Sequence, residues 1–257
     1  MTQTEKAGRF QALHQRAGAF LIPNPWDAGS ARILAGLGFE AFATSSGAAA
    51  ATYGRRDGKL TRDEALASAR AIAQATDLPV SADLENGFGD DPSIVAETVR
   101  MAAEAGLVGC SIEDSTGDKS RPFYDLQSAV ERVAAAVQSA RSLPFHFTLT
   151  ARAENFVRGN PDLDDTIKRL QAYEKAGADV LFAPALPDLA AVRRVCSAVS
   201  KPVNFMIGIR GKSFTTAELV AAGVKRISFA SSLHRNRITR AISSGFGHFA
   251  KSALICS

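Results

Sequence analysis

The feature that most constrains the fold is an eightfold alternation of two kinds of segment along the chain. Short apolar runs, rich in β-branched and aromatic residues, alternate with Ala-rich amphipathic stretches. The strand-like runs cover residues 19–24, 41–46, 79–85, 109–114, 145–152, 180–185, 203–208 and 226–231. The expected helices lie near 27–37, 61–76, 92–105, 126–141, 162–176, 188–199 and 215–222, with another after Leu233. Such alternation is typical of a parallel sheet buried on both faces.

The links before several of these runs repeat as well. AGLGFEAF, AEAGLVGC, EKAGADVL and VAAGVKRI each place a glycine between a helix and the next strand, where a left-handed residue ends the helix. Eight such units without a Pro-, Gly- or Ser-rich linker predict one α/β domain over 1–257, a (β/α)8 TIM barrel. An open doubly wound sheet is the main alternative. It normally has fewer strands, and residues 22–30 (IPNPWDAGS) lack its dinucleotide fingerprint.

Composition and charge exclude several classes of protein. Hydrophobic residues make up 46% and charged residues 22%, so most of the chain is not disordered. No apolar run approaches the roughly 18 residues of a membrane span, and the N-terminus has no secretory pattern. The net charge of +4 is spread over short pairs, which argues against nucleic-acid binding and is compatible with a small anionic ligand. Three cysteines without metal-type spacing suit a reducing environment, and we expect a cytoplasmic protein.

In a TIM barrel the active site lies at the carboxyl ends of the strands. The third expected strand ends in Asp83 and Glu85, which strand alternation places on one face, and the fourth ends in Glu113. Three acids at one barrel mouth repel one another unless a cation or proton intervenes. Carboxylate oxygens suit Mg²⁺, or Mn²⁺, rather than zinc. The alternative is that these acids cap loops or pair with arginines.

The second expected strand ends in small residues that can cradle an anion. The backbone N–H groups of Ser45, Ser46, Gly47 and Ala48 can bind a carboxylate or a phosphate, although Ser-Ser-Gly is also an ordinary turn. The following loop places Asp57 on the same rim, where an isolated aspartate is often a turn former.

Three further side chains are candidates for a pocket. Arg152 ends the fifth expected strand and can hold a carboxylate or stabilise an enolate; pairing with Glu113 or Glu154 fits the spacing almost as well. Trp26, beyond the first strand, can cover a small pocket or pack on the first helix. Asn204 in the seventh strand can face the barrel interior.

Other chemistries fail on residue type. Residues 210–213 resemble the end of a phosphate loop, but Met206 occupies the position of its first glycine. Lys201 stands at the wrong end of its strand for a Schiff base, no Gly-x-Ser-x-Gly elbow is present, and the four histidines lack zinc spacing. A phosphate-ester barrel that uses the glycines of 208–211 and the strand end Ser231–Ser232 is a weaker alternative.

Taken together, the strand-end motifs resemble the isocitrate lyase/phosphoenolpyruvate mutase superfamily over nearly the whole chain. The matching segments fall in the same order, at 24–27 (NPWD), 44–47 (TSSG), the Asp57 loop, 81–87 (SADLENG), 111–114 (SIED) and 150–152 (TAR). The resemblance implies a Mg²⁺-dependent barrel that binds an α-keto acid and stabilises a pyruvate-type enolate.

By similarity, Asp83 would contact Mg²⁺ most directly, with Glu85 and Glu113 acting partly through water, and Asp57 would lie near the metal. Residues 45–48 would bind the keto-acid carboxylate, with the ring of Trp26 over it, and Arg152 would face the enolate. The resemblance also implies a homodimer or homotetramer that exchanges its last helix between subunits.

Two departures from the family pattern bear on the substrate. The lyases carry a Lys-Lys/Arg-Cys-Gly-His lid after the fourth strand, where this chain has 115–122 (STGDKSRP), without cysteine and without the asparagine of the mutases. They also carry a glutamate after the sixth strand, where this chain has 182–185 (FAPA). We therefore predict a Mg²⁺-dependent carbon–carbon lyase or decarboxylase for an oxaloacetate-like α-keto or 2-hydroxy carboxylate. The alternatives are a phosphonopyruvate-type mutase or hydrolase and a keto-acid-binding barrel without turnover.

Overall fold

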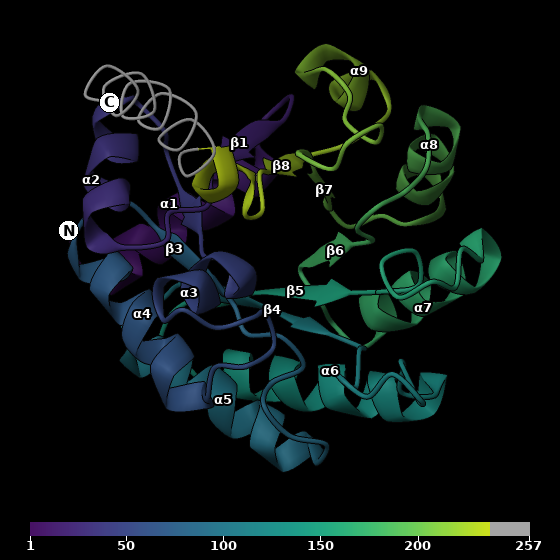
Figure 1. The fold of residues 1–257 in the computed structure, drawn as a ribbon, viewed down its shortest axis with the longest axis horizontal. Helices are drawn as coiled ribbons and strands as arrows, with labels where there is room; N and C mark the ends of the chain where they lie inside the picture. Colours follow the sequence, from purple (N-terminus) through teal and green to yellow (C-terminus); the bar gives the residue numbers. More distant parts are fainter. Residues whose placement is uncertain (237–257) are drawn as a thin grey trace, which may run out of the picture.

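The computed structural model describes residues 1–236, and its centre is a nearly closed barrel of eight parallel strands surrounded by helices (Figure 1). The strands pair in the order β1-β8-β7-β6-β5-β4-β3-β2. Between β1 and β2 the amide of Ala43 donates to the carbonyl of Pro23 at 3.1 Å. The predicted TIM barrel is confirmed. The strands are β1 (Phe20–Ile22), β2 (Phe42–Ala43), β3 (Val80–Asp83), β4 (Gly109–Glu113), β5 (Thr148–Arg152), β6 (Val180–Phe182), β7 (Val203–Met206) and β8 (Arg226–Ser228).

Each expected helix up to residue 222 is present, within two residues of its predicted bounds. The helices are α1 (Gln3–Gln15), α2 (Ala28–Gly36), α3 (Ser46–Thr52), α4 (Arg62–Gln74), α5 (Pro92–Glu104), α6 (Leu126–Arg141), α7 (Leu163–Lys175), α8 (Leu189–Ala198) and α9 (Thr216–Ala221). Helices α1 and α3 were not expected. Another helix starts at 232, but the expected exchange of a C-terminal helix lies outside the described residues. Within residues 1–236, no helix combines the length and apolar character that a bilayer crossing requires.

Side-chain caps set where the helices begin. Thr61 accepts a hydrogen bond from the amide of Glu64 and the Glu64 carboxylate accepts one in return, which closes a capping box at the start of α4. Asp188 likewise caps α8 through the amide of Ala191 at 2.8 Å. These local bonds satisfy amide groups that the first turn of a helix leaves without partners.

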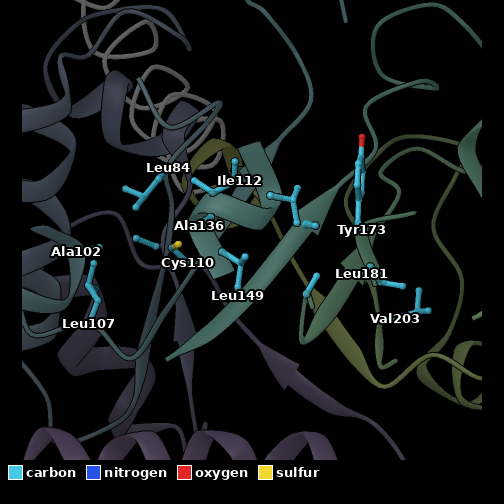
Figure 2. Close-up of a cluster of buried hydrophobic side chains, with 14 of the residues drawn as sticks. Leu84, Ala102, Leu107, Cys110, Ile112, Ala136, Leu149, Tyr173, Leu181 and Val203 are labelled. Atoms are coloured by element: carbon cyan, nitrogen blue, oxygen red, sulfur yellow. The ribbon is translucent and has the colours of Figure 1, made fainter. Parts of the chain in front are cut away.

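The main core lies between the outer face of the barrel and the helices. Figure 2 shows Cys110 and Ile112 of β4, Leu149 of β5 and Leu181 of β6 in this layer, and all four are at most 2% exposed. Burial also raises the pKa of the Cys110 thiol, so it behaves as a small hydrophobic side chain.

Helix α1 closes the amino-terminal end of the barrel. Its Phe10 and Leu13 form a buried cluster with Phe20, Ala41 and Val108, which lie at the starts of β1, β2 and β4. The opposite end, where the strands terminate, is thereby left as the open end.

His14 of α1 is a buried, neutral imidazole. Burial, together with the nearby charge of Arg226, lowers its pKa to about 3. Its Nδ1 lies 2.8 Å from the carbonyl oxygen of Phe10, and its ring packs edge-on against Phe10 and Phe20. An imidazole that stays neutral in the folded state but titrates near 6.5 in the unfolded chain makes folding less favourable as the pH falls below 6.5.

We expect this histidine to cost the folded state about 2 kcal/mol between pH 7 and pH 5. Urea unfolding of the wild type and of His14→Gln at both pH values measures the difference. The variant should show a smaller loss of stability on acidification. Equal losses in the two proteins would contradict the assignment of a neutral buried His14.

Candidate active site

The open end of the barrel contains a cavity of about 1000 Å³. Nine of the predicted site residues line it: Ser45, Ser46, Gly47, Asp57, Asp83, Glu85, Glu113, Arg152 and Asn204. Trp26 and Ala48 are not among the described residues that line it. The ring of Trp26 instead packs edge-on against His234 with 5.3 Å between centroids, and the amide of Ala48 donates to the Ser45 hydroxyl that caps α3.

Asp83 and Glu85 reach the same cavity by different backbone conformations. Strand β3 ends at Asp83, and Glu85 has a φ of +51°, in the left-handed region that non-glycine residues rarely adopt. The predicted common location is correct, but simple strand alternation is not its cause. A turn at the end of β3 carries Glu85 to the cavity, and backbone strain of this kind clusters at functional sites.

Asp83 is held from three sides. Its carboxylate accepts hydrogen bonds from the amide and the hydroxyl of Ser46, at 3.2 and 3.0 Å, and from Nη1 of Arg152 at 2.9 Å. The hydroxyl of Ser111 on β4 donates to the same carboxylate at 3.4 Å. The end of β3 is thus tied to α3, β4 and β5.

Arg152 is the centre of a buried cluster of ion pairs. Besides Asp83 it contacts Glu113 at 3.1 Å and Glu154 at 2.9 Å, and its guanidinium lies 5.1 Å from the centre of the Phe182 ring. The alternative kept open from the spacing, pairing with Glu113 and Glu154, is therefore confirmed. Sequence analysis missed Arg158, which contacts Glu113 at 2.9 Å and Glu154 at 3.5 Å.

Burial gives the acids of this cluster unusual affinities for protons. Burial, repulsion from Asp83 and repulsion from Asp57 raise the pKa of Glu85 to about 7. Burial is also the largest cause that raises the pKa of Glu113 and of Glu154, in spite of their arginine partners. Among the described residues, nothing donates a hydrogen bond to the carboxylate of Glu85 or forms an ion pair with it. Glu85 is therefore an acid without a direct cationic contact in 1–236, although Arg152 and Arg158 still act on it electrostatically.

A second missed arginine supports the loop that carries Glu85. Arg132 of α6 is 2% exposed, and it donates to the carbonyls of Asn86, Gly89 and Asp90. Its guanidinium stacks 4.1 Å from the centre of the Tyr124 ring. Three carbonyls bound to one buried guanidinium fix the path of the chain directly after Glu85.

The close packing of Asp57 against α3 depends on Gly47. A Cβ atom at Gly47 would lie 3.3 Å from the carboxyl group of Asp57, so a larger residue would push Asp57 aside. Gly47 thereby permits the close approach that places Asp57 beside the cavity and near enough to Glu85 to affect its titration.

Comparison with known proteins identifies the family of this chain. The model of the phosphoenolpyruvate phosphomutase family matches residues 10–244. The chain belongs to this family. The predicted membership of the isocitrate lyase/phosphoenolpyruvate mutase superfamily is thus confirmed.

Three relatives illustrate the range of the family. A Burkholderia cenocepacia J2315 structure, provisionally titled a lyase/mutase, is 52% identical with a TM-score of 0.89, over 98% of this chain and 87% of that one. The 2-methylisocitrate lyase of Escherichia coli K12 is 33% identical over 88% of this chain and 78% of its own length. The 2,3-dimethylmalate lyase of Eubacterium barkeri is 30% identical over 84% of this chain and 77% of its own length.

The departures from the family pattern lie at the rim of the cavity. An antiparallel bridge between Ser115 and Phe123 closes the loop that replaces the cysteine-containing lid, and Lys119 of this loop lines the cavity. Arg121, the second basic residue of the loop, is not among the described residues that do so. At the end of β6, Phe182 and Pro184 line the cavity where the family resemblance implies a glutamate in lyases. None of the described lining residues is a cysteine.

The donor chemistry fits a hard divalent cation, although the side chains are not arranged around one. No group of three or more His, Cys, Asp and Glu side chains within residues 1–236 has metal-holding geometry. Arg152 bonds to Asp83 and Glu113, two of the three expected ligands. The carboxyl group of Glu85, with Asp83 and Asp57 close enough to raise its pKa, supplies oxygen donors of the kind that Mg²⁺ prefers, and a bound cation would relieve the repulsion among these acids.

Proposed function

We propose that the protein is a Mg²⁺-dependent carbon–carbon lyase or decarboxylase that acts on a small α-keto or 2-hydroxy carboxylate of the oxaloacetate type. One observation carries this proposal. Asp83, Glu85, Glu113 and Arg152 line a single cavity at the open end of the barrel, and Glu85 forms no ion pair among the described residues. Several carboxylates gathered beside an arginine in this way are suited to a cation and a chelating anion together.

The roles of the side chains follow from their positions. Asp83, Glu85 and Glu113 would hold Mg²⁺, or Mn²⁺, and Asp57 would act beside it. When bound, the metal supplies Lewis acidity that withdraws electrons from the chelating oxygens of the oxo-acid. Arg152 is kept charged by its three carboxylate partners, and it stabilises negative charge that develops on the substrate as the carbon–carbon bond breaks.

The remaining lining groups would bind and enclose the substrate. Ser45, Ser46 and Gly47 offer backbone and hydroxyl donors on the α3 wall for the keto-acid carboxylate, and Asn204 offers an amide deeper in the barrel. The roles that the family resemblance implies for Ala48, binding the keto-acid carboxylate, and for Trp26, packing over that carboxylate, stay predictions. Phe182 keeps water from one face of Arg152, which strengthens its electrostatic effect.

The relatives define the class of reaction, and the substrate is our inference. The chain is an enzyme of the lyase type, as are its relatives named 2-methylisocitrate lyase and 2,3-dimethylmalate lyase. Those names describe cleavage of substituted 2-hydroxy acids that carry two or three carboxylates. The missing lid cysteine and the missing glutamate after β6 favour a different or simpler substrate. They also support a second candidate, a keto-acid-binding barrel without turnover.

The test is to measure pyruvate release from oxaloacetate, phosphonopyruvate and 2-methyl-substituted malates, with Mg²⁺ and with EDTA. We expect Mg²⁺-dependent pyruvate formation from oxaloacetate or a substituted malate, and its loss in EDTA. Release from phosphonopyruvate alone would support the mutase or hydrolase alternative. Calorimetry showing Mg²⁺-dependent pyruvate binding, with no product from any compound, would support the binding barrel.

A further inference from the structure

Arg226 is a buried arginine on the inner face of the barrel with no acidic partner among the described residues. It is the first residue of β8, is 5% exposed, and lines the same cavity as the acids. Its Nε donates to the side-chain oxygen of Asn204 at 2.9 Å, and its Nη2 donates to the hydroxyl of Thr150 at 3.0 Å. Within residues 1–236, its buried Nη1 has no hydrogen-bond partner.

The other arginines that line the cavity are of two kinds. Arg56 and Arg235 are exposed and form no ion pair among the described residues, whereas Arg152 and Arg158 contact acids. Arg152 contacts three carboxylates and Arg158 contacts two. Within the described part of the chain, Arg226 forms no ion pair, and both of its hydrogen-bond acceptors are neutral. Burial, together with repulsion from Arg152, lowers the pKa of Arg226 to about 9.

A buried cation without a counter-charge is costly to the folded state. The neighbours of Arg226 hold its guanidinium in place without neutralising it. The amide of Asn204 also donates to the hydroxyl of Ser228 at 3.1 Å, so the oxygen of Asn204 stays turned toward Arg226. An arginine fixed in this way, facing a cavity, is suited to bind an anion that arrives from outside.

We propose that Arg226 binds a second carboxylate of the substrate, so that the enzyme selects dicarboxylates over monocarboxylates of similar size. This inference rests on the proposed function, because it assigns the 2-oxo or 2-hydroxy acid end of the substrate to the acidic side of the cavity. The far carboxylate then supplies the negative charge that Arg226 lacks. Arg226 acts as a specificity-determining residue, and Asn204 and Thr150 orient it.

The experiment compares malate with 2-hydroxybutyrate, which share a 2-hydroxy acid end and differ in a carboxylate or a methyl group at the other. Oxalate, which carries only a chelating end, is the reference. Affinities are measured by calorimetry with Mg²⁺ for the wild type, Arg226→Gln and Arg226→Lys. Thermal unfolding shows whether each variant folds, and Arg226→Gln removes an unpaired buried charge, so we expect it to be at least as stable as the wild type.

The wild type should prefer malate, and Arg226→Gln should weaken malate binding roughly 10- to 100-fold, as for a hydrogen bond to a charged group. Binding of 2-hydroxybutyrate and oxalate should change little, and Arg226→Lys should restore part of the preference. Equal affinity of the wild type for malate and 2-hydroxybutyrate would overturn the inference, whether or not the variants fold. An equal loss for all three ligands in Arg226→Gln would also overturn it, because that result indicates a structural role.

The two proposals fail in different ways. If oxalate does not bind to the wild type with Mg²⁺, the proposed metal and keto-acid site is wrong. The comparison of malate with 2-hydroxybutyrate still decides the role of Arg226, and absence of binding for both would reject it. A preference for malate that persists undiminished in Arg226→Gln would also overturn the inference, because another group would then bind the far carboxylate.

Discussion

Replacing Arg152 with methionine is expected to lower the free energy of unfolding by about 3–5 kcal/mol at pH 8, the usual cost of breaking a buried ion pair from one side. Asp83, Glu113 and Glu154 all contact this guanidinium, and Glu154 is fully buried. Arg158 remains near two of them but is itself partly exposed. The variant therefore keeps three acids with too little positive charge.

The loss should shrink as the pH falls. Without Arg152 the pKa values of Glu113 and Glu154 rise further above those of the unfolded chain, and the folded variant binds protons at pH values where the unfolded chain does not. Its stability relative to the wild type is then greatest at low pH and declines as the pH rises. Urea unfolding at pH 8 and pH 5.5 measures both quantities.

Two further proteins serve as controls for Arg152→Met. Arg194 forms an exposed ion pair with Asp164 at 2.7 Å, so Arg194→Met should cost no more than about 1 kcal/mol at either pH. Adding Glu154→Gln to Arg152→Met removes one of the uncompensated acids and should recover part of the stability. A loss in Arg152→Met as small as that in Arg194→Met would refute the central role of this arginine.

The second large effect is expected for Asp83→Asn, which should lower Mg²⁺-dependent turnover roughly 10²- to 10³-fold. The substitution removes the carboxylate that family resemblance places nearest the metal. It keeps a side chain of the same size, which can still accept hydrogen bonds from Ser46. The fall in kcat/KM should be accompanied by weaker Mg²⁺ binding in a calorimetric titration.

Folding should respond in a different way. Asp83 is one of the charges that raise the pKa of Glu85, so Asp83→Asn relieves repulsion at the site, and Arg152 retains Glu113 and Glu154 as partners. We expect the stability of metal-free Asp83→Asn to stay within about 1 kcal/mol of the wild type. Asp77→Asn, at an exposed side chain that pairs with the N-terminus, is the control and should change neither property. Turnover and Mg²⁺ dependence that survive in Asp83→Asn would exclude Asp83 as a ligand.

The local pattern of the sequence was sufficient to predict the fold and to predict which end of the barrel carries the candidate site. Short apolar runs, helix periodicity and glycine links are properties of neighbouring residues, and they predicted the eight strands and seven of the nine helices α1–α9. The sequence pattern missed α1, because its Ala7, Phe10 and Leu13 form only a narrow apolar face that a barrel end must cover. Acids at successive strand ends pointed to the cavity, since parallel strands bring their carboxyl ends to one side.

The partners of the charged groups depended on contacts between residues far apart in the chain. Arg152 meets Asp83 across 69 positions, and Arg132 reaches the loop after Glu85 across more than 40. Spacing along the sequence cannot predict which of several neighbouring acids an arginine will pair with. The pairing depends on the direction and burial of the side chains, which only the folded barrel sets. Arg226 was overlooked for a related reason: it opens β8 and so lies away from the strand ends that the barrel rule singles out. Only the folded barrel shows that it reaches the cavity and that no acid within residues 1–236 neutralises it.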